Sequence, residues 1–244
     1  MPSTPHPARH ASLYILLGLL LLSAILVPVI AFRYAYDMSS WIAGGGGFAL
    51  LLAAFGGTWL ITRTARRDAA PAALDRITLS GLVLGLLWTI EIGINNFVAP
   101  PLPGRDTADD SFWALIALGI LIASVVAAYS LGRFKAGLAV GTWSGLASGA
   151  VACVTALALI IFGMPLLLSD PVNLTEWANR AKDSTAPTMA SYFAFETMAG
   201  AFLHLVALGV GMGFVLGAVG GALGTAAKLG PSRLRHRPSG LQKG

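Results

Sequence analysis

Long apolar runs separated by short polar segments fill most of this chain. A helix needs about 20 mostly apolar residues to cross the hydrocarbon core of a bilayer, which is about 30 Å thick. Six runs reach that length, and they span residues 12–32, 41–61, 79–99, 112–131, 138–162 and 193–217. The pattern therefore predicts an all-α, polytopic membrane protein with six transmembrane helices.

The composition favours a membrane protein and excludes several other classes. Hydrophobic residues make up 56% of the 244 and charged residues only 11%, whereas soluble domains carry about 25% charged residues. The single cysteine, Cys153, excludes an intrachain disulfide and any multi-cysteine metal site. The predicted partner is the lipid bilayer, with another membrane subunit as an open alternative. No cofactor, metal or nucleic acid is expected.

The basic residues are divided unequally between the two sides of the predicted bundle. One set of helix flanks holds twelve of them: Arg9, Arg63, Arg66, Arg67, Arg76, Arg133, Lys135, Lys228, Arg233, Arg235, Arg237 and Lys243. The opposite flanks hold only Arg33, Arg105, Arg180 and Lys182. Positively charged flanks stay in the cytoplasm, so both termini are expected inside.

This orientation divides the chain into three parts. We expect a cytoplasmic tail at 1–11, a single six-helix transmembrane domain at 12–227 and a basic cytoplasmic tail at 228–244. The arginine-rich basic set indicates the cytoplasmic (inner) membrane of a bacterium.

Glycines recur at four-residue steps in the third, fifth and sixth predicted helices. They are Gly81 and Gly85, then Gly137, Gly141, Gly145 and Gly149, then Gly209, Gly213 and Gly217. Residues four apart share one helix face, and small residues let helices in lipid approach closely. The pattern predicts a glycine-packed core of helices 3, 5 and 6 in the cytoplasmic half. The second helix carries a milder strip, and the leucine-rich first helix is expected at the lipid-facing periphery.

Five polar residues fall inside the predicted helices, from mid-membrane outward. They are Glu91, Asn95, Asn96, Glu196 and His204. An ionisable residue in hydrocarbon costs about 2.5–3.5 kcal/mol on insertion scales and is a functional candidate by default. We therefore expect a polar ligand site at the external end, centred on Glu91.

Three interpretations of that polar cluster remain open. In the first it is structural, and the chain is a non-enzymatic structural or accessory subunit. In the second the chain is a small-solute, lipid or proton transporter or permease that uses Glu91 and His204. In the third it is an intramembrane enzyme or pigment protein. Ser148 and His204 resemble the serine–histidine dyad of rhomboid-type intramembrane proteases, although Leu146 replaces the first glycine of that family's Gly-x-Ser-Gly motif. The first interpretation is the prediction and the second its alternative.

The external segments contain two further signals. Asp170 followed by Pro171 is typical of a helix start, and it predicts a short surface helix through Trp177. Asp106, Asp109 and Asp110 cluster before the fourth helix and are expected to form a solvated acidic turn.

Overall fold

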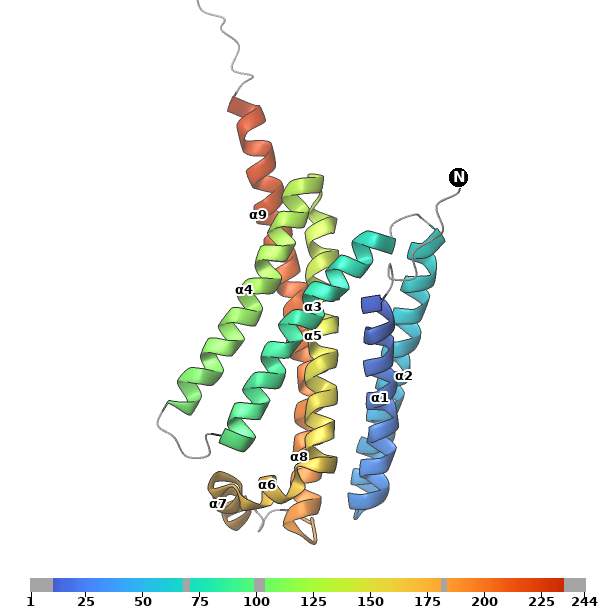
Figure 1. Ribbon diagram of the computed structural model, residues 1–244, viewed down its shortest axis with the longest axis vertical. Helices are drawn as coiled ribbons and strands as arrows, with labels where there is room; N and C mark the ends of the chain where they lie inside the picture. The colour runs from blue at the N-terminus through green and yellow to red at the C-terminus, as the bar shows by residue number, and fades with distance from the viewer. Residues whose placement is uncertain (1–10, 68–70, 99–103, 181–183, 235–244) are drawn as a thin grey trace, which may run out of the picture.

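The computed structural model describes residues 11–67, 71–98, 104–180 and 184–234, and within them every regular element is a helix. Figure 1 shows them as a bundle of long rods with two short helices at one end. In chain order they are α1 (Ala11–Tyr34), α2 (Met38–Arg67), α3 (Pro71–Gly93), η2 (Ile94–Val98), α4 (Arg105–Leu131), α5 (Phe134–Phe162), α6 (Met164–Ser169), α7 (Pro171–Arg180), α8 (Met189–Leu203), η3 (His204–Gly211) and α9 (Met212–Leu234). The η segments are π-helical.

Six helices are long and apolar enough to cross a membrane, which confirms the predicted number among the described residues. The sixth is a single rod built from α8, η3 and α9, and the candidate span within it runs from Met189 to Leu229. The apolar pattern after residue 162 is not a continuation of the fifth helix. The cap at Gly163 ends α5, and α6 begins directly afterwards. We call the end of the bundle that carries α6 and α7 the α7 end, and the opposite end the α9 end (Figure 1).

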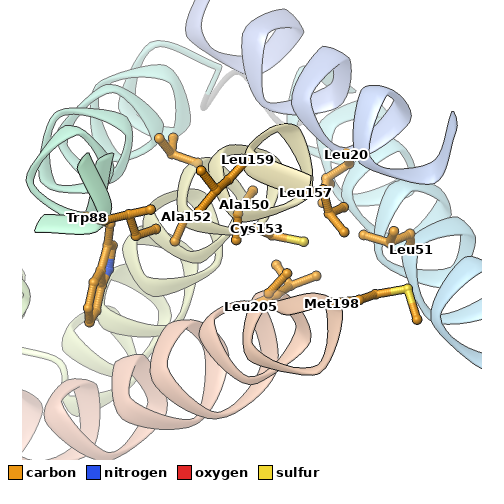
Figure 2. Close-up of a cluster of buried hydrophobic side chains, with 14 of the residues drawn as sticks. Leu20, Leu51, Trp88, Ala150, Ala152, Cys153, Leu157, Leu159, Met198 and Leu205 are labelled. Atoms are coloured by element: carbon orange, nitrogen blue, oxygen red, sulfur yellow. The ribbon is translucent and has the colours of Figure 1, made fainter. Parts of the chain in front are cut away.

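Helix α5 lies at the centre of the bundle and packs against α1, α3, α4, α8, η3 and α9. Its Cys153 and Leu157 are fully buried. Figure 2 shows these two side chains between Leu20 of α1 and Leu205 of η3. An almost wholly apolar, small-residue sequence suits this position, because a helix with neighbours on several sides needs no polar face.

The first helix was expected at the lipid-facing periphery, and this describes only one of its faces, which exposes Tyr14, Ile25 and Phe32. Another face of α1, including Leu16, Leu20 and Val27, is inaccessible to solvent, and the helix packs against α2, α3 and α5. Helix α2 is the outer one, since its extensive contacts are with α1. A leucine-rich surface packs against protein as readily as against lipid, because both surroundings are apolar. Leucine content therefore does not distinguish the two.

Helix α5 and the η3–α9 rod approach backbone to backbone. A Cβ built on Gly141 would lie 2.4 Å from Gly217 Cα, and one on Gly145 would lie 2.2 Å from Gly209 O. The two facing rows also include Gly137 and Gly149 on α5, and Gly209, Gly213 and Gly221 on the η3–α9 rod. No side chain larger than hydrogen fits between these backbones.

The other glycine contacts do not form a core in which α3, α5 and α9 all pack on one another. Gly81 and Gly85 of α3 face Ser144 and Val151 on another side of α5, so α3 and α9 each pack on α5 rather than extensively on one another. Helix α4 packs on α9 as closely as α5 does. Gly220 and Gly224 of α9 contact α4, and neither glycine belongs to the predicted rows.

Replacing Gly145 by alanine should force α5 and η3 apart, because its Cβ would meet a backbone oxygen that cannot rotate away. We expect Gly145→Ala to lower the free energy of unfolding in detergent by about 1–3 kcal/mol, the usual range for overpacking. The matched control is Gly18→Ala on α1, where an added Cβ meets nothing within 4 Å. Equal thermal stability of the two variants would contradict the close contact.

The junction between α1 and α2 is fixed by one carboxylate. Asp37 Oδ1 accepts hydrogen bonds from the Ser40 backbone N–H at 2.8 Å and from the Ser39 hydroxyl at 2.8 Å. Its Oδ2 accepts from Thr185, just before α8, at 3.2 Å. These donors, the Ser40 N–H first, hold the pKa of Asp37 below its ordinary value of 3.8.

A carboxylate with a lowered pKa stabilises the folded state above its unfolded pKa, and this contribution is lost as the pH falls through the folded value. We expect Asp37→Asn to weaken the acid sensitivity of thermal unfolding below about pH 4, and Ser39→Ala to weaken it in part. The measurement is the melting temperature in detergent at neutral and acid pH. An Asp37→Asn profile parallel to that of the unsubstituted protein would refute this.

Candidate functional site

A cavity of about 230 Å³ opens near the α7 end of the bundle. Its lining comes from four parts of the chain: Glu91, Ile92, Asn95 and Asn96 of α3 and η2, Arg105 of α4, Ala156 and Leu159 of α5, and Thr197, Gly200 and His204 of the sixth rod. Four of the five polar residues singled out in the sequence therefore lie together here. Glu196 is the exception, because it is exposed and is not among the lining residues.

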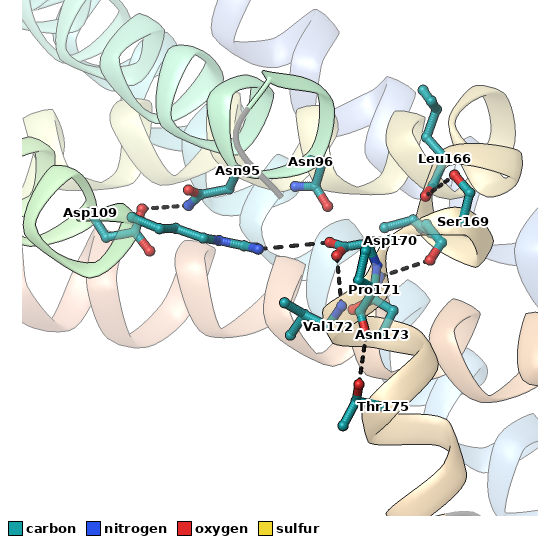
Figure 3. Close-up of polar contacts among 12 residues, drawn as sticks. Asn95, Asn96, Asp109, Leu166, Ser169, Asp170, Pro171, Val172, Asn173 and Thr175 are labelled. Carbon is teal, nitrogen blue, oxygen red and sulfur yellow. Dashed lines mark hydrogen bonds and ion pairs between the residues drawn. The ribbon is translucent and has the colours of Figure 1, made fainter. Parts of the chain in front are cut away.

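An amide between two carboxyl groups forms the centre of the site. Asn95 Nδ2 donates to Glu91 Oε1 at 2.7 Å and also to Asp109 Oδ1; Figure 3 shows Asn95 and Asp109 facing each other from η2 and α4. Both acceptors are carboxylate oxygens, so the amide must present its nitrogen to them and its oxygen away. Glu91 Oε2 and Asn95 Oδ1 are buried and have no hydrogen-bond partner.

Both π-helical segments lie at this cavity. Segment η2 carries Asn95 and Asn96, and η3 begins at His204. A π turn widens the helix and displaces side chains from α-helical register, and such turns are frequent at functional sites. His204 Nδ1 lies 2.7 Å from Gly200 O, so the proton of the neutral ring is on Nδ1 and Nε2 is left as an acceptor.

Arg105 is the basic residue of the lining, and it is paired. Its guanidinium lies 3.7 Å from Asp170 Oδ2. The other oxygen of Asp170 accepts from the Val172 backbone N–H at 2.9 Å, at the start of α7. The predicted surface helix therefore exists, and its first carboxylate also holds the beginning of α4.

Aromatic rings pack beside the cavity. Trp88 is fully buried, and its ring centroid lies 4.9 Å from that of His204 and 5.2 Å from that of Trp113, both edge to face. These contacts join α3, α4 and η3 directly beneath the polar groups. The Trp88 indole nitrogen is buried without a hydrogen-bond partner.

The three aspartates that were expected in a solvated acidic turn lie in the first turns of α4. Asp106, Asp109 and Asp110 line a second hollow of about 350 Å³ together with Trp113. Asp109 belongs to this hollow and is also bonded to Asn95 of the inner cavity. No group of three or more His, Cys, Asp or Glu residues that could hold a metal ion occurs in the described part of the chain.

A larger cavity of about 480 Å³ lies on the other side of the α3–α5 contact. It shares Ile92 and Leu159 with the polar cavity, which form the wall between the two. None of the described residues that line it is ionisable. The hydroxyls of Thr89 and Thr155 lie 3.0 Å apart and satisfy one another. This second cavity therefore offers mainly apolar contact.

The structure adds residues that the sequence reasoning missed. Arg105, Asp109 and Trp113 all lie near the start of α4, before or at the edge of the predicted fourth span. Their four-residue steps share one helix face, which was the available signal. The serine–histidine resemblance is not realised as a bonded pair, since Ser148 Oγ is buried without any hydrogen-bond partner.

The six apolar helices indicate a multi-pass membrane protein with a polar cavity at one end. Comparison with protein-family models, with curated proteins and with solved structures gives no significant match.

Asp170 should stabilise α7 in two separable ways. Asp170→Asn keeps an acceptor for the Val172 N–H but removes the charge opposite Arg105, whereas Asp170→Ala removes both. We expect Asp170→Ala to destabilise α7 by about 1–3 kcal/mol and Asp170→Asn by less. Hydrogen exchange of the α7 amides measures this. Identical exchange in both variants would show that the cap contributes nothing.

Proposed function

We propose that this chain is a multi-pass protein of the bacterial cytoplasmic membrane with both termini in the cytoplasm. The unequal division of basic residues supports that orientation. The α9 end then faces the cytoplasm, and the cavity around Glu91 faces outward. We further propose that the glycine rows of α3, α5 and the sixth rod hold the core together in the cytoplasmic half.

The function that the geometry supports best is a non-enzymatic one, the transport of a small solute, with this conformation open to the outside. The cavity carries the proposal: it is polar, it lies beside two π-helical segments, and buried polar atoms around it have no partner. A purely structural cluster would be expected to satisfy its own hydrogen bonds.

Transport requires that the cytoplasmic half also open. The contact that closes it is the face between α5 and the η3–α9 rod, which is made of glycine backbone without interlocking side chains. Smooth surfaces of this kind can slide or separate without repacking side chains, as in shear motions between helices. The π turn at His204 provides a flexible position within the sixth rod.

Cysteine accessibility tests whether the closed half opens. In a Cys153→Ala background, Thr197→Cys, which lines the cavity, should react with an impermeant maleimide added outside. Ser148→Cys should react from the cytoplasmic side, although Ser148 is 1% exposed in this conformation. Ser148 precedes Ala156 of the lining by eight residues on α5, which places it about 12 Å nearer the α9 end.

Ala150→Cys is the matched control, because Ala150 is fully buried on the same helix and lies two residues from Ser148, on the opposite face. It should be far less reactive than Ser148→Cys from the cytoplasmic side if a path opens past Ser148. A Ser148→Cys variant that stays as unreactive as this control from both sides would refute transport.

One observation favours a second function, that of an accessory subunit. The small-residue strip of α2 (Gly45, Ala49, Ala53 and Gly57) is exposed, and a Cβ at either glycine would meet nothing within 4 Å. Such a strip allows close approach of another helix. Co-purification of a stoichiometric partner that is lost on Gly45→Leu but kept on Gly18→Leu would support this function.

A further inference from the structure

We propose that the cavity around Glu91 binds a small primary ammonium cation, and that this cation competes with a proton for the Glu91 carboxyl group. This inference rests on the proposed function, because it names the chemical class of the solute. Four features of the site support it: two unpaired oxygens, more carboxyl groups than basic groups, an acidic hollow beside the cavity, and a volume that suits a small molecule.

The site has two unpaired acceptor oxygens, and its unpaired donor, Arg105 Nη1, lies beside the Asp170 carboxylate. Glu91 and Asn95 are each 7% exposed, both line the cavity, and each has one buried oxygen without a donor. The Asn95 amide cannot be turned to repair this, because its nitrogen already serves two carboxylates. A primary ammonium group brings three N–H donors and no acceptor, which is the complement of these oxygens.

The charges around the cavity also favour a cation. Glu91 and Asp109 approach the same amide from α3 and α4. Arg105 is the cation of the lining, and it is paired with a third carboxylate, that of Asp170. The described residues at the site therefore include three carboxyl groups and one guanidinium. An anionic solute would be repelled, and a neutral one would leave the Glu91 carboxyl group to be neutralised by a proton.

In this proposal the acidic hollow lined by Asp106, Asp109 and Asp110 is the entrance, and it concentrates cations from outside. Asp106 and Asp110 flank Asp109 in the outer hollow, and a cleft lined by one sign of charge raises the local concentration of the opposite ion. Trp113 adds an aromatic wall there, a surface that attracts ammonium groups through its π face. Asp109 then connects entrance and cavity, because it belongs to the hollow and bonds to Asn95.

Size and ligand type separate this cation from others. The cavity of about 230 Å³ suits a small molecule, because drug-sized pockets begin at about 300 Å³. The described residues offer no three-ligand group for a metal ion. A quaternary ammonium ion has no N–H to give the unpaired oxygens, so a primary amine is preferred to it.

Competition with a proton follows from the surroundings of Glu91. The charged or titratable groups that face it are Asp109 and Arg105 from α4 and His204 from η3, whereas α5 contributes only Ala156 and Leu159 to the lining. A carboxylate at this depth needs a proton or a cation as partner. Binding of the ammonium group therefore releases the Glu91 proton to the outer solution, and one positive charge replaces another.

Calorimetric titration of the purified full-length protein with ethylammonium chloride tests the proposal. We expect saturable binding, at least about tenfold weaker binding of tetramethylammonium and sodium, and at least about a tenfold loss in Glu91→Gln. Glu196→Gln is the matched control, a carboxyl group on α8 outside the cavity, and it should bind normally. Below the pH at which Glu91 gains its proton, the affinity should fall about tenfold per pH unit.

The outcomes separate this proposal from the proposed function. Saturable binding of acetate or ethylene glycol in place of ethylammonium would overturn the cation class and leave a solute cavity intact. Ethylammonium binding unchanged in Glu91→Gln, or independent of pH, would overturn the role of Glu91. If Glu91→Gln does not fold, two other titrations decide the question. They are that of Asp109→Asn with ethylammonium and that of the unsubstituted protein with the ligand series. Ammonium binding without any labelling of Ser148→Cys would support the cation site and refute transport.

Discussion

Backbone-to-backbone contact along α5 is the constraint on which the rest of the arrangement depends. In lipid, helices gain little from burying leucine, so close van der Waals approach must contribute most of the association. At Gly141 and Gly145 that approach is close enough to exclude a methyl group. The depth and rotation of the sixth rod relative to α5 are thereby set, and α4 is fixed in turn by its own contacts with α9 at Gly220 and Gly224.

The same constraint creates the cavity. The contacts of Gly149 with His204 O and with Gly209 are the last of the glycine row. Beyond them toward the α7 end, larger side chains such as Leu159 keep the helices from closing. Water or a solute can enter where the backbones diverge, and polar side chains become tolerable there. Glu91 and Asn95 lie in this wider region, where a carboxyl group meets an amide rather than hydrocarbon.

Much of the fold followed from two periodicities that a sequence displays directly. Runs of about 20 apolar residues defined the six spans. The four-residue glycine steps of α5 lie next to the backbone of the sixth rod, and their role in holding the core together remains a proposal. The side of the helix on which a polar residue lies was harder to predict. Glu196 was grouped with Glu91 by depth, yet it points to another side of α8. The depth of a residue in the membrane follows from counting residues along the helix. The direction of its side chain depends on the rotation of the helix, which the packing of α8 on its neighbours decides.

There is also a physical reason why the sequence did not identify the site residues of α4 and the α6–α7 junction. Arg105, Asp109 and Asp170 lie outside or at the edge of the apolar runs, where charged residues are ordinary and carry no signal of burial. They become part of the cavity because α4 begins well before its apolar run, and because α6 and α7 bring Asp170 to the guanidinium of Arg105. That convergence joins segments 65 residues apart, and no local pattern encodes it.

The link between the glycine contact and the polar site gives the molecule a route for coupling them. Gly149 meets the backbone of His204, whose ring packs on Trp88, one helical turn before Glu91. Any separation of α5 from η3 must therefore move the His204 ring relative to Trp88 and change the shape of the cavity. Coupling of this kind needs no long pathway, since the element that closes one half of the bundle also lines the site in the other.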